Sequence, residues 1–323
     1  MDRYKVANII SRCRRQKGVQ QEVLCRGICS NANYSRIESG DVEIPLVMVQ
    51  AFLERLGVDP DQLEQLLEGE DYGFYRKRRD IEKALQDGLD AQAGQLLDAY
   101  EGAAGEDRLE IQYVKYCRAR VAHLHIRQDA SLDPRERERL ARDAGRLLQE
   151  TESLTIPQRR RGMLLSRTEL GILLEETEGI GLEEMRYIQD FVRKYYNREW
   201  KEEYLPQVQL KYAGLLDEKG EYDGALAEIQ KGLAAVKSGK SYRCCADLHF
   251  LAAQVAGRMN GKAPGKKEQK EQAQECRQAY YLYAMDRNPR AEEVKEYMEV
   301  MGRTELELGG FSIKGEMVVS SNL

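Results

Sequence analysis

The chain has 323 residues, with 50 basic and 55 acidic side chains and a net charge of −5. This length allows two domains, and the abundance of Ala, Leu, Glu, Lys, Arg and Gln with only 7 prolines predicts helices throughout. No apolar run is long enough to span a bilayer and residues 1–5 lack the apolar core of a signal peptide, so we expect a cytoplasmic protein. The 7 cysteines have no metal-ligand spacing, which favours reduced thiols and no bound cofactor.

The charge is unevenly distributed along the chain. Residues 1–40 contain eight basic and three acidic side chains, whereas the rest of the chain is acidic. DNA phosphates are attracted by local positive charge and not by the net charge of the whole protein. The N-terminal region is therefore the part that we expect to bind double-stranded DNA.

Five helices are predicted in this region from apolar periodicity and cap residues. Ser30 is a favourable N-cap because its hydroxyl can accept a free backbone N–H, and Gly40 suits the C-terminus of the same helix. The helices are expected over residues 2–17, from 20, from 30 to 40, after 45 and after 60.

The third of these helices has the features of a DNA-recognition helix. Its first residues carry amides, a hydroxyl and a guanidinium, whereas Tyr34 and Ile37 form an apolar back. A short helix of this kind fits the major groove, where side chains reach base edges. The residues expected to contact base edges are Asn31, Asn33, Ser35 and Arg36, those expected to hold phosphates are Arg14, Gln20 and Gln21, and Ser30 opens the helix at the same interface.

These residues resemble a known family. The runs Gln20–Glu22, Gly27–Ser30, Tyr34–Gly40 and Leu56–Val58 are similar to the phage-repressor (XRE) type of helix-turn-helix. The turn Gly27–Ser30 is one residue longer than in the commonest members and is similar to that of peptide-pheromone-sensing regulators of the Rgg/PlcR/PrgX group. The resemblance implies a transcription regulator of the quorum-sensing type, whose partners are DNA and a short signalling peptide. A helical bundle without nucleic-acid contacts is the alternative.

Beyond residue 68 the chain continues as amphipathic helices in pairs. We place the DNA-binding domain at residues 1–68, a linker at 69–74, and a sensor and dimerisation domain at 75–323. A single DNA-binding domain of this size contacts few base pairs, so we expect a homodimer on a palindromic operator. Breaks between helices are expected near residues 88, 102–105, 133–134, 156–157, 179–181, 220 and 260–265.

A degenerate tetratricopeptide pattern is clearest between residues 204 and 237. Small residues in this pattern let two helices approach closely, and weaker copies of it lie near residues 171 and 252. The positions that match are Ala213, Leu216, Gly220, Tyr222, Ala225, Ile229 and Gly232. The predicted fold is therefore all-α, a five-helix helix-turn-helix domain followed by an α-solenoid, with a plain helical bundle as the alternative. The tail 304–323 is too rich in Gly and β-branched residues to be another repeat, and either caps the last pair or is disordered.

The repeat register predicts a peptide-binding face. With one helix running from Pro206 to Lys219, every third or fourth residue faces a groove, and the neighbouring repeats supply the equivalent positions. The Gln207 amide can both donate to and accept from a peptide backbone, and the excess of acidic groups favours a basic or neutral peptide. Ordinary solvated helix surface is the alternative. The predicted residues are Thr168, Glu169, Glu175, Gln207, Leu210, Lys211, Gly214, Asp217, His249 and Phe250.

Enzyme motifs are absent from the sequence. It contains no P-loop, GxGxxG after a strand, HExxH or GxSxG, and its 3 histidines offer few general bases. Two functions remain, a peptide-gated transcription regulator and a DNA-tethered scaffold whose repeats bind a partner protein. Helical repeats bind both kinds of partner, so the fold does not separate these two functions.

Overall fold

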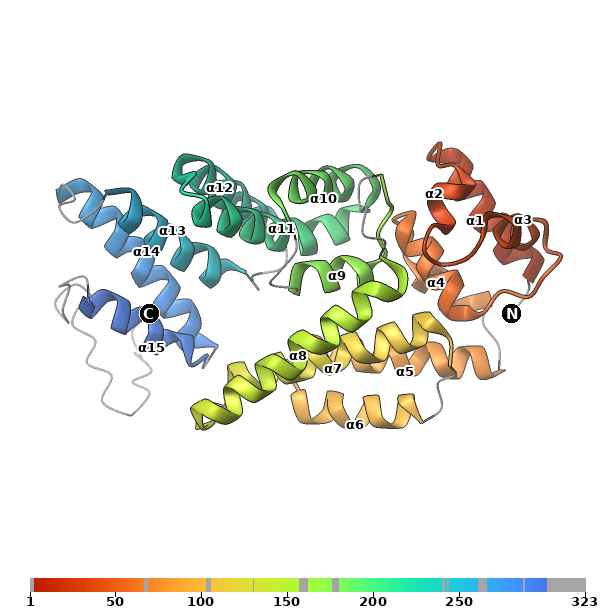
Figure 1. The fold of residues 1–323 in the computed structure, drawn as a ribbon, viewed down its shortest axis with the longest axis horizontal. Coiled ribbons are helices and arrows are strands. Elements are labelled where there is room, and N and C mark those ends of the chain that lie inside the picture. Colours follow the sequence, from red (N-terminus) through yellow and green to blue (C-terminus); the bar gives the residue numbers. More distant parts are fainter. Residues whose placement is uncertain are drawn as a thin grey trace, which may run out of the picture.

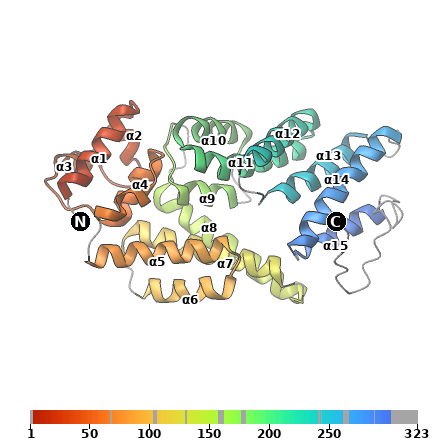
Figure 2. The ribbon, with the colours of Figure 1, turned by 180° about the vertical axis from the view of Figure 1, so that it is seen from behind.

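The computed structural model is helical in all of its regular secondary structure, which confirms the predicted all-α class. A small N-terminal domain lies at one end, and paired helices extend from it in a curved row (Figures 1 and 2). The structure describes residues 3–66, 69–102, 106–129, 131–156, 162–175, 180–239, 242, 244–260, 266–286 and 288–300. The tail 304–323 lies outside the described residues.

The N-terminal domain, residues 3–66, has the predicted order of elements. Ile10, Tyr34 and Phe52 are fully buried in its core, and the Tyr34 and Phe52 rings meet edge to face with centroids 5.1 Å apart. The fifth element is a 3-10 helix and not an α-helix. The elements are α1 (Arg3–Gln16), α2 (Gln21–Cys25), α3 (Asn31–Ser39), α4 (Leu46–Arg55) and η1 (Pro60–Leu66).

The helical domain, residues 69–300, consists of helices that pack mostly against the next helix in the chain, although α9 packs against α8 and α11. The helix α11 also contacts α13, so α9, α11 and α13 follow one another along one side of the row. The bounds are α5 (Gly69–Gln86), α6 (Asp90–Glu101), α7 (Arg108–Gln128), α8 (Pro134–Thr155), α9 (Arg167–Glu175), α10 (Leu182–Tyr195), α11 (Arg198–Glu218), α12 (Tyr222–Ser238), α13 (Cys245–Asn260), α14 (Lys266–Met285) and α15 (Arg290–Val300). Each predicted break falls between two of these helices.

Two predicted boundaries are wrong. The expected linker 69–74 is helical, because α5 begins at Gly69 and continues through Gly73, and a glycine inside a helix costs only about 1 kcal/mol. The helix α11 begins at Arg198 and not near Pro206, since Asn197 caps it by accepting the backbone N–H of Trp200 at 2.9 Å. Pro206 therefore lies inside α11, where it removes one backbone donor without ending the helix.

The small residues of the α11–α12 pair are buried as the pattern requires. Ala213 and Ala225 have no exposed surface, and a Cβ added to Gly232 would lie 2.9 Å from a methyl carbon of Leu248 on α13. Close approach of these helices therefore depends on the small side chains. Within the described residues, no helix is both long and apolar enough to cross a membrane.

Candidate nucleic-acid interface and its junction with the helical domain

The helix α3 has one buried and one exposed face. Ser30 accepts the backbone N–H of Asn33 at 3.2 Å, and Gly40 ends the helix in the left-handed conformation. Tyr34 and Ile37 are buried, whereas Asn31, Ala32, Ser35 and Arg36 are exposed. Residues at this spacing share one side of a helix. The exposed side thus offers an amide, a hydroxyl and a guanidinium, the groups that pair with base edges and phosphates.

Asn33 lies away from this exposed side. Its side chain is half-buried, so its predicted base contact stays a prediction. Gln20 is exposed at the N-terminus of α2 and its side chain accepts no backbone N–H as a cap, which leaves its amide available to a phosphate.

Arg14 and Gln21 are partly buried and contact a carboxylate. The Arg14 guanidinium donates to both Glu38 oxygens, at 2.6 and 3.0 Å, and to the Val19 carbonyl at 2.7 Å. The Gln21 amide and the Tyr34 hydroxyl also donate to Glu38, at 2.6 and 2.9 Å. Burial raises the pKa of Glu38, but these donors outweigh it and lower the pKa on balance. The predicted phosphate-binding roles of Arg14 and Gln21 are thus replaced by a structural one, which joins α1, α2 and α3.

The positive charge that faces solvent comes from other residues. Arg12 and Arg15 are exposed on α1, and Arg36 is exposed on α3. Lys17 instead donates from Nζ to the Tyr195 carbonyl of α10 at 2.9 Å. Exposed arginines of this kind supply the sequence-independent attraction to phosphates.

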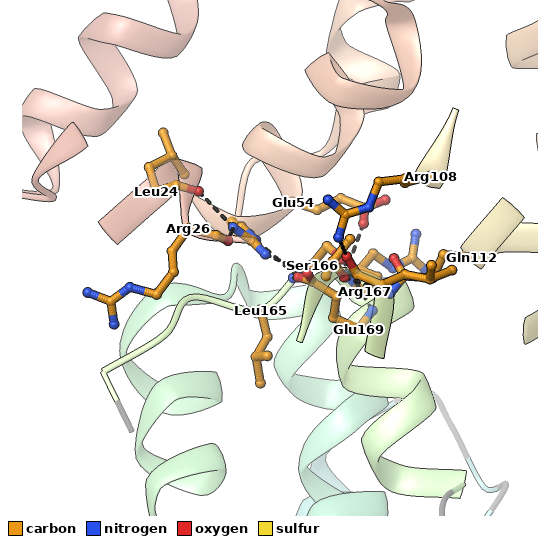
Figure 3. A network of polar contacts seen from close by, with 12 residues as sticks. Leu24, Arg26, Glu54, Arg108, Gln112, Leu165, Ser166, Arg167 and Glu169 are labelled. Carbon is orange, nitrogen blue, oxygen red and sulfur yellow. Dashed lines mark hydrogen bonds and ion pairs between the residues drawn. The ribbon is translucent and has the colours of Figure 1, made fainter. Parts of the chain in front are cut away.

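Arg55 links the N-terminal domain to the helical domain. This fully buried guanidinium forms a bidentate ion pair with Glu169 of α9, which is itself 1% exposed. Its remaining Nη1 donates to the carbonyls of Leu24 and Arg26 at 2.8 and 2.7 Å, where α2 ends. Figure 3 shows these carbonyls on one side of the network and Glu169 on the other. One side chain therefore connects α4, the end of α2 and α9.

Glu169 is positioned by the start of its own helix. Its carboxylate accepts the backbone N–H of Ser166 at 2.8 Å, and the Ser166 hydroxyl accepts the backbone N–H of Glu169 at 3.2 Å. This reciprocal arrangement is a capping box. The Ser-x-x-Glu spacing at 166–169 was a detectable sequence signal for it, but nothing in the sequence indicated that the same carboxylate would meet Arg55.

Backbone contacts complete the junction. Gly27 and Gly57 both have positive φ, and a Cβ on either would lie about 2 Å from a carbonyl oxygen of the helical domain, that of Thr155 or Tyr195. The Glu54 carboxylate accepts the backbone N–H of Arg167 at 2.9 Å. Burial raises the pKa of Glu54 to about 7, against the opposing charge of Arg167. Both turns therefore need glycine for conformation and for space.

A cavity of about 940 Å³ lies beside this junction. Its walls come from α4 and η1 on one side and from α5, α7 and the start of α9 on the other. Arg78, Arg120 and Arg167 face Glu54 and Glu82 within it, so charges of both signs line the space. The predicted peptide residue Thr168 also lines this cavity.

Several other residues of the predicted peptide face are engaged in contacts between helices. Glu175 of α9 pairs with His123 at 2.9 Å, and Lys211 donates to the Leu174 carbonyl at 3.0 Å. Asp217 is buried and pairs with Arg258 of α13 at 2.7 Å. These bonds stabilise neighbouring repeats, so they compete with any peptide contact.

Two predicted peptide residues are not available at the surface. Glu169 is buried in the junction, and Phe250 is 4% exposed among the aromatic residues of α14 and α15. His249 is half-buried and pairs with Glu275 at 2.6 Å. Gln207, Leu210 and Gly214 are half-buried on α11, and the Gln207 amide donates back to the Glu203 carbonyl at 3.0 Å. The face that remains for a ligand is therefore centred on α11.

Part of the chain matches a known sequence family, and the chain is similar to several solved structures. Residues 10–63 match the sequence family described as helix-turn-helix, and no curated protein matches the chain. The chain is similar to PlcR of Bacillus thuringiensis, solved with the peptide PapR7 and DNA, at 14% identity over 93% of this chain and 100% of that one, with a TM-score of 0.43. It is similar to ComR of S. thermophilus, solved with DNA and its signalling peptide ComS, at 16% identity over 92% and 99%, with a TM-score of 0.39.

A third similar structure is the pheromone receptor Rgg2 of Streptococcus dysgalactiae, at 14% identity over 91% of this chain and 99% of that one, with a TM-score of 0.38. The family match over residues 10–63 agrees with the helix-turn-helix resemblance of residues 20–58.

Proposed function

We propose that this chain, whose residues 10–63 are a helix-turn-helix domain, is a transcription regulator that binds an operator through α3 and is controlled by a short signalling peptide bound to its helical domain. The observation that carries the proposal is the buried Arg55–Glu169 pair, which connects the DNA-binding domain to α9. A ligand that moves α9 therefore acts directly on the element that supports α2 and α3.

The DNA-binding half rests on the exposed side of α3 and its surroundings. Asn31, Ser35 and Arg36 project from a helix whose other side is fixed in the core, and exposed Arg12 and Arg15 add positive charge nearby. Fixed geometry with exposed donors is what base readout needs. We assign base contacts to α3 and phosphate contacts to Gln20 and the exposed arginines.

Selection from a library of random 30-bp duplexes tests this half. The purified chain should enrich a palindromic sequence, and Arg36→Ala should weaken binding to it by about 1–3 kcal/mol. Lys219→Ala, an exposed substitution in the helical domain, is the matched control and should bind as the wild type does. A selection without enrichment would refute the DNA-binding role. Light scattering of the chain on the selected duplex tests the dimer that a palindrome implies.

The peptide half rests on the face of α11. Gln207, Leu210, Lys211 and Gly214 lie on the helix that contacts α9, α10, α12 and α13, so a ligand there reaches several repeats at once. Calorimetry with synthetic peptides encoded by short reading frames beside the gene provides the test. Gln207→Ala should weaken the best peptide about tenfold, and Lys231→Ala on α12 should not. If a larger protein binds this face and no peptide does, the scaffold function is correct instead.

A further inference from the structure

Two cysteines frame the turn between α2 and α3. Cys25 is the last residue of α2, and Cys29 precedes Ser30, the N-cap of the recognition helix. The backbone N–H groups of Ile28 and Cys29 both donate to the Cys25 carbonyl, at 2.9 and 3.0 Å. A turn closed by a hydrogen bond between its first and fifth residues brings those residues close together, and a disulfide spans Cα atoms about 4.4–6.8 Å apart.

The Cys25 thiol donates to the Glu22 carbonyl oxygen at 3.7 Å. It is also close enough to Cys29 for each thiol to affect the pKa of the other. The Cys29 thiol lowers the pKa of Cys25 to about 7 against the effect of burial, and the Arg55 guanidinium contributes in the same direction. The lowered pKa favours the nucleophilic thiolate of Cys25, which is itself buried, so a small oxidant reaches the pair past half-buried Cys29.

The turn also carries the contacts of the interdomain junction. The Leu24 and Arg26 carbonyls accept from Arg55, which pairs with Glu169, and Gly27 packs against the Thr155 carbonyl. A new covalent bond across residues 25–29 acts on a segment that has α3 on one side and the helical domain on the other. Among the described cysteines, Cys25 and Cys29 are therefore placed where oxidation would affect both α3 and the contact with the helical domain.

We propose that Cys25 and Cys29 form a reversible dithiol–disulfide site that responds to peroxide and weakens DNA binding when oxidised. The thiolate attacks one oxygen of hydrogen peroxide, the O–O bond breaks and hydroxide leaves, which gives a sulfenic acid. The second thiol attacks that sulfur, the S–O bond breaks, the S–S bond forms and the sulfenic oxygen leaves as water. The two thiols lose two electrons and two protons, and peroxide becomes two waters.

Peptide mapping of the full chain tests the site itself. Trypsin cleaves after Lys17, Arg26 and Arg36, so a Cys25–Cys29 disulfide joins the peptides 18–26 and 27–36, which are separate when reduced. After treatment with a small excess of hydrogen peroxide, we expect this joined pair without reductant and its loss with dithiothreitol. Cys29→Ser should abolish it and Cys244→Ser should not. Absence of the joined peptides in the wild-type digest would refute the site.

Fluorescence anisotropy with a mixed-sequence 30-bp duplex at low salt tests the consequence. We expect oxidised protein to bind about tenfold more weakly than reduced protein, dithiothreitol to restore affinity, and Cys29→Ser to be insensitive to peroxide. Equal affinity of the oxidised and reduced forms would refute the effect on DNA binding. Failure of the reduced protein to bind any duplex would refute the proposed function instead, while the peptide map would still decide whether the disulfide site exists.

Discussion

Two arginine–carboxylate pairs with the same bidentate geometry have different positions in this molecule. Arg14 and Glu38 join helices within the N-terminal domain, with side chains 12% and 7% exposed. Arg55 and Glu169 join that domain to α9, with side chains 0% and 1% exposed. Removing charges from water is costly, and the cost is offset only when every donor and acceptor is satisfied. The interdomain pair therefore specifies how the two domains dock more strictly than ordinary apolar contact would.

The donors and acceptors around the interdomain pair are arranged for this role. Arg55 donates to two carboxylate oxygens and two carbonyls, and Glu169 also accepts the Ser166 backbone N–H. A polar network in a dry environment stabilises a structure only when it is complete. Loss of one member therefore leaves the others buried and unsatisfied.

The largest expected effect follows from breaking this pair. Glu169→Gln keeps the shape of the side chain but leaves the buried Arg55 charge without a counter-ion, so we expect a loss of about 3–5 kcal/mol in unfolding free energy. Differential scanning calorimetry should show this loss as a lower melting temperature, with the N-terminal domain unfolding earlier than the rest.

A matched control uses a more exposed pair in the same region. Glu203 pairs with Arg167 at 3.4 Å and its side chain is 24% exposed, so Glu203→Gln should cost about 0–1 kcal/mol. Equal effects of the two substitutions would mean that the Arg55–Glu169 pair has no special role in docking.

The second effect comes from the pair within the N-terminal domain. Arg14→Ala removes one of three donors to Glu38, whereas Gln21 and Tyr34 still donate, so we expect a loss of about 2 kcal/mol in unfolding free energy. Arg15→Ala, the neighbouring exposed arginine, should change stability by less than about 0.5 kcal/mol. Urea denaturation monitored by circular dichroism measures both.

The same two substitutions separate structure from DNA contact. Arg15→Ala should lower the slope of log affinity against log salt by about one unit, as expected for one lost phosphate contact. If instead Arg14→Ala changes that slope and leaves stability intact, the phosphate-binding role predicted for Arg14 from the sequence is correct and the structural role is wrong.

The sequence predicted most of the fold because local signals determine it. Ser30, Gly40 and Pro45 each act within a turn of their own positions, so helix starts and ends could be read directly. Helix breaks in the helical domain were predicted for the same reason. The boundary at 69–74 was missed because two glycines suggested a linker, although glycine lowers helix stability by only about 1 kcal/mol and neighbouring contacts override it.

The candidate site was only partly predictable because its key contacts join distant residues. Arg14 and Glu38 are 24 positions apart, and Arg55 and Glu169 are 114 apart, so periodicity could not pair them. A basic side chain near a recognition helix was therefore interpreted as a phosphate contact, and an acidic one on α9 as a peptide contact. Exposed Ser35 and Arg36 were identified correctly as surface residues because their spacing places them on a different side of the helix from Tyr34 and Ile37, and Asn31 is exposed as the first residue of α3.

The smallest expected effect is a change of unfolding free energy with pH, which should differ between a carboxylate of the N-terminal domain and one at the junction. Donors lower the pKa of Glu38 in the folded protein, so its stabilising effect is present above the unfolded pKa of about 4.3 and is lost as pH falls below it. Burial raises the pKa of Glu54 at the junction to about 7. The contribution of Glu54 to stability therefore changes with pH in the opposite direction to that of Glu38. The Glu54 contribution is complete below about pH 4.3 and is lost as pH rises towards 7, because the unfolded chain releases the proton first.

Unfolding free energy measured by urea denaturation should therefore include a Glu54 contribution that falls by about 3 kcal/mol between pH 4.5 and 7. Glu54→Gln removes this contribution while its amide oxygen still accepts the Arg167 backbone N–H. The variant should be more stable relative to wild type at pH 8 than at pH 5. Glu22→Gln, on a side chain 72% exposed, is the control and should follow the wild-type profile. A Glu54→Gln profile parallel to wild type would show that Glu54 is already ionised in the folded junction, held by Arg167 and Arg78.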